Sequence, residues 1–181
     1  WLRGPDGRRR PVDLLKKIVL RRANAVICVS EALRQDSFAG ALVVPNPYND
    51  QLFYKLPNIK KDRALVFLGR LVSDKGADLL VEAFARLATD REFQDACTRQ
   101  GINWHLTIVG SGSEEQTLRS LVLKKGLADR VEFSGSMTGE KLVSILNRHR
   151  VIAIPSRWRE PFGMVALEGM ACGCVPIGSD G

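Results

Sequence analysis

The alternation of short apolar runs with helical patterns is the feature of this sequence that most constrains its fold. Each run ends in a turn rich in glycine, serine or proline, and most of the turns lead into residues with helical spacing. The runs are Ala25–Val29, Leu42–Val44, Leu65–Leu68, Leu106–Val109, Val131–Phe133, Val151–Ile154 and Val175–Ile177. Buried strands that alternate with helices form right-handed parallel units. The pattern therefore predicts an α/β fold, a doubly wound, Rossmann-like parallel sheet with helices on both faces.

The helices are predicted from apolar spacing and from residues that favour helix ends. Apolar residues recur with a helical period of about 3.6 residues at Leu79, Leu80, Ala83, Phe84 and Leu87. A later helix is expected to open near Phe162, because Pro161 suits the first helical position. The polar segment 89–103 is expected to be a surface excursion between a helix and the next strand.

Segment 45–63 is the predicted domain boundary. It contains Pro45, Pro47 and Pro57 and the basic run Lys60-Lys61-Asp62-Arg63, a composition typical of a linker. Residues 1–44 then belong to one domain and residues 64–181 to another. We expect the chain to be a piece of a longer protein, truncated within its second domain, since it begins at Trp1 and stops just after an apolar run.

The net charge of +7 is concentrated before the second domain. Residues 1–63 carry 13 Lys and Arg against 6 Asp and Glu, whereas residues 64–181 carry 14 of each. Most of the excess lies in Arg8–Arg10, Lys16-Lys17 and Arg21-Arg22. A solvated helix face is the favoured explanation, and contact with an anionic membrane surface is the alternative. We expect no nucleic-acid partner.

The cysteines and histidines do not form a metal-binding pattern. Cys172-Gly173-Cys174 is too closely spaced for a zinc pair, and Cys28 and Cys174 lie in apolar runs. His105 and His149 are far apart in sequence, and no D-x-D pair occurs. We therefore predict no metal site, reduced thiols and a cytoplasmic location, at the inner face of the membrane if the basic segment binds lipid.

Two carboxylates, Glu160 and Glu168, flank the segment Pro161–Leu167. Were the whole span helical, a rise of about 1.5 Å per residue would separate them by roughly 12 Å along the axis. Glycosidase acid and base pairs need carboxyls roughly 5–9.5 Å apart. The spacing therefore favours holding two ends of an extended ligand over attacking one bond. Gly163 would allow close approach to the backbone, and amides at a helix start bind phosphate.

Segment Gly69–Gly76, with the sequence GRLVSDKG, adds two cations after a strand. Arg70 and Lys75 would face the edge of the sheet where such folds bind ligands, with Ser73 or Asp74 capping the next helix. A capped turn with solvated cations is the alternative to an anion site. Because the segment lies at the same edge as Glu160–Glu168, the anion site is favoured. The turn at Gly110–Ser113 lacks the dinucleotide fingerprint and is interpreted as a tight turn.

Taken in order, four segments resemble the retaining, nucleotide-sugar-dependent glycosyltransferases of the GT-B fold, the group 1 or family 4 type. They are Pro45–Asn49 with Phe53, the GRLVSDKG segment, Leu106–Gly112, and Pro155-Ser156 with Glu160–Glu168 and Ala171–Gly173. The resemblance covers about residues 24–181. It implies that residues 1–44 are the tail of the acceptor-side domain and that residues 64–181 are the donor-binding domain.

The resemblance also implies roles for individual residues. Arg70 and Lys75 would hold the donor diphosphate in place of a metal ion, and Glu160 would bind hydroxyls of the transferred sugar. The donor-binding residues would be Phe162, Gly163, Met164 and Val165 through backbone amides, Glu168 at the ribose, and Ser136 and Met137 beside the base. Front-face transfer would retain the anomeric configuration without a protein nucleophile.

The partners implied by the resemblance are a nucleotide-sugar donor and a sugar or lipid-linked acceptor. No cofactor is expected, and UDP is favoured over GDP on family frequency. The chain alone is expected to be inactive. Two other functions stay open, a nucleotide-sugar epimerase of similar fold and a non-catalytic module that binds anions or membranes.

Overall fold

The chain forms two compact units, and the computed structural model describes its residues 11–158 and 160–179. The first unit comprises Trp1–Pro47 and Glu160–Met164, and the second comprises Tyr48–Arg159 and Val165–Gly181. The assignment of the first unit to an acceptor-side domain and of segment 45–63 to a linker stays a prediction.

The first unit contains a small parallel ribbon and two helices. Its elements are α1 (Pro11–Arg21), β1 (Ile27–Cys28), α2 (Glu31–Ser37) and β2 (Leu42–Val43). Strands β1 and β2 pair in parallel, with Ile27 opposite Leu42. The Ser30 hydroxyl accepts a bond from the Leu33 amide and so caps α2. Within the described residues, no helix is long and apolar enough to cross a lipid bilayer.

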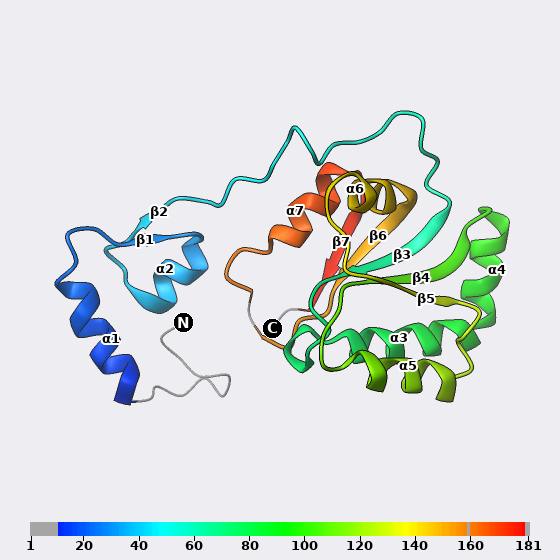
Figure 1. Cartoon of the computed structure of the whole chain (residues 1–181), viewed down its shortest axis with the longest axis horizontal. Helices are drawn as coiled ribbons and strands as arrows, with labels where there is room; N and C mark the ends of the chain where they lie inside the picture. The colour runs from blue at the N-terminus through cyan, green and yellow to red at the C-terminus, as the bar shows by residue number, and fades with distance from the viewer. Residues whose placement is uncertain (1–10, 159, 180–181) are drawn as a thin grey trace. The chain divides into compact units, whose positions relative to one another are not determined.

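The second unit is built on a five-stranded parallel sheet (Figure 1). Its elements are β3 (Arg63–Leu68), the 3-10 turn η1 (Ser73–Lys75), α3 (Ala77–Thr89), α4 (Arg91–Arg99), β4 (Asn103–Val109), α5 (Glu115–Lys124), β5 (Val131–Gly135), α6 (Gly139–Arg148), β6 (His149–Ile154), α7 (Met164–Ala171) and β7 (Val175–Gly178). Every neighbouring pair of strands runs in parallel. The predicted strands of the second domain are confirmed, each lengthened by one to three residues.

Helices cover both faces of this sheet, as the doubly wound prediction requires (Figure 1). On one face α3 and α5 pack through residues such as Phe84 and Leu118 against Leu65 and Ile108. On the other face Leu146 of α6 and Cys172, which directly follows α7, pack against Val66 and Ile152. In β3, Leu65 and Phe67 thus face one core, whereas Val66 and Leu68 face the other. Because both faces of the strand are buried, its apolar run is continuous.

The strand order is β5-β4-β3-β6-β7. The chain therefore builds outward from β3 to β5 and then crosses over to place β6 on the other side of β3. Loops that follow β3 and β6 diverge at such a reversal, and ligands of doubly wound sheets bind in the crevice that the loops leave. The topology thus predicts a ligand site at the carboxyl ends of β3 and β6.

Segment 89–103 is a surface excursion between α3 and β4, as predicted, but most of it forms a helix, α4, that was not predicted. The Asp90 carboxylate accepts a bond from the Phe93 amide and caps α4. Phe93 meets the Trp104 ring edge-on at a centroid distance of 4.5 Å, and Cys97 is buried. The helix was not predicted from the sequence because its apolar face consists only of Phe93, Ala96 and Cys97 and its other residues are polar.

Helix α7 begins at Met164, later than the start predicted near Phe162. Gly163 has a φ of 82°, a left-handed conformation that an α-helix cannot include. Pro161 therefore lies before the helix rather than in its first turn. Glu160 also precedes the helix, so the axial separation of roughly 12 Å calculated for a continuous helix does not apply.

Residues 48–62, all of which the structure describes, form no helix or strand but are fastened to the second unit. The side chain of Asn147 donates to the Tyr54 carbonyl and accepts from the Leu56 amide, at 3.0 and 2.8 Å. The Lys61 ammonium donates to the carbonyls of His149 and Cys172 at 2.6 and 3.0 Å. Backbone groups that would otherwise lack partners are thereby bonded.

His149 is a buried structural residue. Its Nδ1 lies 2.6 Å from the Ile145 carbonyl, so Nδ1–H donates there, and Nε2 accepts from the Thr107 hydroxyl at 2.9 Å. Burial lowers the pKa of the His149 imidazole to about 4, opposed by the bond to Ile145 and assisted by the charges of Arg63 and Arg148. The folded protein therefore keeps this imidazole neutral at pH values where the unfolded chain protonates it.

Acidification from pH 7.5 to 5.0 should lower the free energy of unfolding by about 2 kcal/mol through His149 alone. The unfolded imidazole binds its proton near pH 6.5 and the folded one near pH 4, so stability falls as the pH drops between these values. Urea unfolding of the wild type and of His149→Asn at both pH values measures the effect. The half-buried His105, whose pKa is also lowered by burial, provides the matched control, since His105→Gln should remove less of the slope. An unchanged slope in His149→Asn would contradict the assignment.

Candidate functional site

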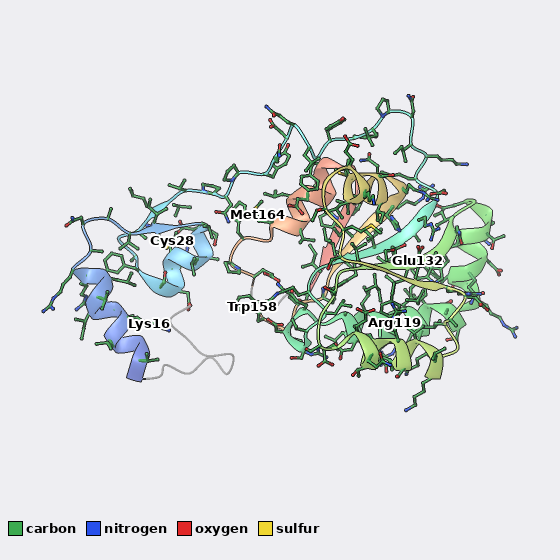
Figure 2. All side chains as sticks on the ribbon, viewed as in Figure 1. Lys16, Cys28, Arg119, Glu132, Trp158 and Met164 are labelled. Atoms are coloured by element: carbon green, nitrogen blue, oxygen red, sulfur yellow. The ribbon has the colours of Figure 1, made fainter. Side chains whose placement is uncertain are left out.

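The loops that follow β3, β4, β5 and β6 meet at the carboxyl edge of the second unit's sheet. The loop after β3 is the GRLVSDKG segment, and the stretch after β6 leads through Trp158 (Figure 2). Of the predicted site residues, Arg70, Lys75, Ser136 and Met137 come from these loops. Parallel strands deliver their loops to one edge, so the topology itself gathers these residues.

Leu71 anchors the GRLVSDKG loop between its two cations. Its side chain is fully buried in the core, although the neighbouring Arg70 is exposed. The Leu71 amide donates to the Ser111 carbonyl and its carbonyl accepts from the Glu114 amide, both at 2.9 Å. The hydrogen bonds that hold Leu71 to the turn after β4 are therefore both between backbone groups.

Glycines allow this contact between the two turns. Gly110 has a φ of 144°, and a Cβ at this position would lie 1.8 Å from the Gly69 carbonyl oxygen. A Cβ at Gly112 would lie 2.3 Å from the Leu71 carbonyl oxygen. The glycines after β4 are thus required by backbone packing against the β3 loop, which accounts for a glycine-rich turn that lacks the dinucleotide fingerprint.

The other end of the loop is held by the residues after β6. Gly76 has a φ of 67°, and a Cβ there would lie 1.9 Å from the Pro155 carbonyl oxygen. The amide of Arg157 donates to the Asp74 carbonyl at 2.9 Å. Gly76 is also the N-cap of α3 and carries no side chain, so the prediction that Ser73 or Asp74 caps this helix was wrong. Those residues form η1 instead.

Arg157 adds an ion pair to this contact. Its guanidinium donates to the Ser73 carbonyl at 2.6 Å and to Asp78 Oδ1 at 2.7 Å, while its second terminal nitrogen bonds Asp78 Oδ2. The bond from Arg157 lowers the pKa of the Asp78 carboxyl below its ordinary value. The loop is thus fixed on both sides of Lys75.

Arg70, Ser136 and Met137 line one pocket of about 240 Å³. The remaining lining residues are Leu68, Gly69, Val109, Gly110, Ser111 and Thr138. The hydroxyls of Ser111 and Ser136 lie 2.8 Å apart at its rim. The structure therefore brings three of the predicted site residues into one concave surface, which the loops after β3, β4 and β5 form.

Lys75 lies at the opposite end of the same loop, beside Trp158. Its ammonium nitrogen is 5.6 Å from the centroid of the Trp158 ring, a cation–π contact. Arg70 and Lys75 thus extend from the two ends of a segment whose centre is buried at Leu71. The arrangement provides two cations on a fixed backbone at the edge where doubly wound sheets bind anions.

The predicted residues of helix α7 have mixed surroundings. Burial raises the pKa of the half-buried Glu168 carboxyl. Val165 packs against the core cluster that contains Ile152 and Cys172. Both belong to the second unit.

Glu160, Phe162, Gly163 and Met164 group with the first unit. There the Ser30 hydroxyl, which caps α2, also donates to the Pro161 carbonyl at 2.6 Å. That these four residues join Arg70 and Lys75 in a single site stays a prediction.

Sequence reasoning missed Arg157, Trp158, Asp78 and Ser30. Arg157 and Trp158 stand between the Pro155-Ser156 and Glu160 motifs, and this adjacency was the available signal. Asp78 and Ser30 gave no comparable signal, because their partners Arg157 and Pro161 are 79 and 131 residues away. Within the described residues, no group of three or more His, Cys, Asp or Glu side chains is placed to hold a metal ion.

Comparison with known proteins supports a glycosyltransferase ancestry. Residues 49–181 match the family described as glycosyl transferases group 1. Mannosylfructose-phosphate synthase of Agrobacterium fabrum is 32% identical over 151 residues, which cover 75% of this chain and 31% of that protein. The chain spans about a third of the length of this and similar curated relatives.

Solved structures show the same fold. Sucrose-phosphate synthase from Thermosynechococcus elongatus has a TM-score of 0.75 at 30% identity, over 98% of this chain and 46% of that one. HepE from Anabaena, solved in complex with UDP, has a TM-score of 0.77 at 19% identity, over 99% of this chain and 51% of that one. The sheet therefore has the architecture of GT-B carboxyl-terminal domains, and the predicted resemblance is confirmed. The chain belongs to the group 1 glycosyltransferase family.

Proposed function

We propose that the second unit binds a nucleotide-diphosphate sugar and that the protein transfers the sugar to an acceptor with retention of anomeric configuration. The observation that carries this proposal is the fixed GRLVSDKG loop, which presents Arg70 and Lys75 at the carboxyl edge of the sheet. Membership of the family supports the class of reaction. The retained configuration and the donor rest on the resemblance and on the site described above.

Arg70 and Lys75 would bind the diphosphate and stabilise charge on it as the bond to the sugar breaks. Arginine suits paired phosphate oxygens, and a lysine ammonium acts as a compact point charge. Because backbone bonds already fix the loop, little ordering free energy is lost when the anion binds. Preorganised cations that meet developing charge are an effective source of catalysis. The two side chains would take the place of a divalent metal.

The pocket beside Arg70 would hold the nucleoside. Ser136 and Met137 would border the base, and Glu168 would bind the ribose hydroxyls. The exposed hydroxyls of Ser111 and Ser136 supply donors and acceptors at the rim. HepE was solved with UDP, which supports UDP as the first nucleotide to test.

The segment before and at the start of α7 would serve the sugar. Glu160 would bind sugar hydroxyls, and the amides of Phe162, Gly163, Met164 and Val165 would meet the sugar and the phosphates. Gly163 has the left-handed conformation that turns the chain into α7, so its amide stands where a helix start attracts anions. The leaving phosphate would assist removal of the acceptor's proton, and no protein nucleophile is required.

Calorimetric titration of the intact protein with UDP, GDP and ADP tests the donor site. We expect one nucleotide to bind with a dissociation constant between about 1 μM and 1 mM, in the range of ordinary enzyme substrates. EDTA should change the affinity by less than about twofold, because Arg70 and Lys75 supply the positive charge. Binding of none of the three nucleotides, or loss of binding in EDTA, would contradict the proposal.

Analysis of the product separates the alternatives. An α-linked glycoside from an α-linked donor indicates retaining transfer, whereas a free epimerised sugar nucleotide indicates an epimerase. If the intact protein forms neither from any donor that it binds, the non-catalytic anion-binding function is favoured.

A sugar or lipid-linked acceptor and peripheral contact with an anionic membrane belong to the same proposal. The exposed Leu15 and Val19 of α1 lie on one face with Lys16, which supports an interfacial role for that helix. The basic run Arg8–Arg10 lies outside the described residues. A cytoplasmic site of action is consistent with the four free cysteines, Cys28, Cys97, Cys172 and Cys174.

A further inference from the structure

Arg157 connects three parts of the loop that carries Lys75. Its amide bonds the Asp74 carbonyl, and its guanidinium bonds the Ser73 carbonyl and both carboxylate oxygens of Asp78. Ser73 and Asp74 belong to η1, the turn that ends at Lys75, and Asp78 lies in the first turn of α3. Arg157 therefore fixes the backbone on both sides of Lys75.

Trp158 contacts the Lys75 side chain itself. The ammonium nitrogen lies 5.6 Å from the centroid of the indole ring. An aromatic face attracts the cation as a whole, whereas the three N–H groups of an ammonium can still donate to oxygens in other directions. The ring thus restricts where the cation sits without replacing an anion as its hydrogen-bond acceptor.

The charge of Arg157 is compensated locally. The bidentate pair with Asp78 joins one positive and one negative group at hydrogen-bond distance, so the pair adds little net field at Lys75. An effect of Arg157 on anion binding should therefore come from the placement of Lys75 rather than from an additional positive charge.

We propose that Arg157 and Trp158 are positioning residues for Lys75, and that the Arg157–Asp78 pair and the Trp158 ring set the affinity for the donor diphosphate through that lysine. This inference rests on the proposed function, in which Lys75 binds the diphosphate. It assigns a role to the stretch between Pro155-Ser156 and Glu160, which connects the sheet with the predicted sugar-binding glutamate.

The test compares a nucleoside diphosphate with its monophosphate in the intact protein. Calorimetry with UDP and UMP, or with GDP and GMP if the wild type prefers guanine, separates diphosphate contacts from those of the nucleoside. Arg157→Ala and Trp158→Leu should each weaken diphosphate binding about tenfold and change monophosphate binding less than about twofold, because a displaced cation loses its contact with the added phosphate. Trp158→Phe, which keeps an aromatic face, should recover most of the loss. Equal losses for both nucleotides would overturn the inference.

A double-mutant cycle shows whether the effect passes through Lys75. In a Lys75→Ala background, Arg157→Ala should weaken diphosphate binding by no more than about twofold, since the group that it positions is absent. The Arg157→Ala/Asp78→Ala variant removes both charges and should remain as weak as Arg157→Ala. If effects were additive in the cycle, or if the charge-neutral variant bound like the wild type, Arg157 would act independently or through its field, and the inference would be wrong.

The outcomes also separate the inference from the function on which it rests. If Lys75→Ala leaves diphosphate affinity unchanged, the proposed function fails. If Lys75→Ala weakens binding but Arg157→Ala and Trp158→Leu do not, only the inference fails. Thermal unfolding of every variant identifies loss of fold, and Arg157→Lys, which keeps the charge without the planar fork, then serves in place of Arg157→Ala.

Discussion

Replacing Lys75 by alanine in the intact protein should lower kcat/KM for the nucleotide-sugar donor by about a thousandfold, which corresponds to about 4 kcal/mol of transition-state stabilisation. Lys75 ends the turn that Arg157 and Gly76 fasten to the β6 loop, so its ammonium is held in place before the donor arrives. Charge grows on the diphosphate as the sugar leaves. Most of the loss should therefore appear in kcat rather than in KM.

Lys124→Ala is the matched control, because it removes the same charge from an exposed position. Lys124 ends α5, at the other end of that helix from the site loops. Its replacement should leave kcat/KM within about twofold, as expected for a distant surface charge that is screened by salt. Steady-state kinetics of both variants at matched ionic strength distinguish a local effect from a general loss of positive charge. Equal losses in the two variants would contradict a specific role for Lys75.

The second large effect should follow from Gly76→Ala, which we expect to lower the free energy of unfolding by about 4 kcal/mol. Two costs add at this position. An alanine with a φ of 67° is strained, and its Cβ would lie 1.9 Å from the Pro155 carbonyl oxygen. Relief requires the loop to separate from the residues after β6. The variant should therefore also lose donor affinity, even where it remains folded.

Gly126→Ala isolates the backbone cost. Gly126 has the same φ of 67°, but a Cβ there would meet nothing within 4 Å. Its substitution should lower stability by only about 1 kcal/mol, the cost of the left-handed conformation itself. Urea unfolding of the two variants measures the difference between their losses of unfolding free energy. That difference is the cost of the contact between the added Cβ and Pro155. Equal destabilisation would show that this contact can relax without cost.

The parallel sheet could be predicted because its strands carry continuous apolar runs and its turns carry glycine. Leu65–Leu68 and Val151–Ile154 are local signals that need no knowledge of their neighbours. The order of the strands has no such local signal, because β3 pairs with β4 and β6 through residues about 40 and 86 positions apart. The sequence analysis predicted a doubly wound sheet but not this order.

The candidate site was predicted in part, for a related reason. Arg70 and Lys75 stand in a compact motif next to a strand, and their location at the carboxyl edge follows from the parallel topology. The clamp by Arg157 joins residues 79 positions apart, and the contact of Gly76 with Pro155 is a property of two backbones. Neither contact produces a periodic pattern in the sequence from which it could be predicted. Helix α4 was missed because its polar residues conceal a narrow apolar stripe, and the start of α7 was misplaced because the conformation of Gly163 overrides the preference of Pro161.

The backbone contacts between the turns after β3 and β4 have a consequence for how the proposed donor site could change. Leu71, Gly110 and Gly112 hold the GRLVSDKG loop without help from the side chains of Ser111, Ser136 or Met137. Under the proposed function, substitutions at those three positions can therefore alter base selection while Arg70 and Lys75 keep their places. Redesign of donor preference can begin with a small library at these positions, and natural divergence within the family has the same route available to it.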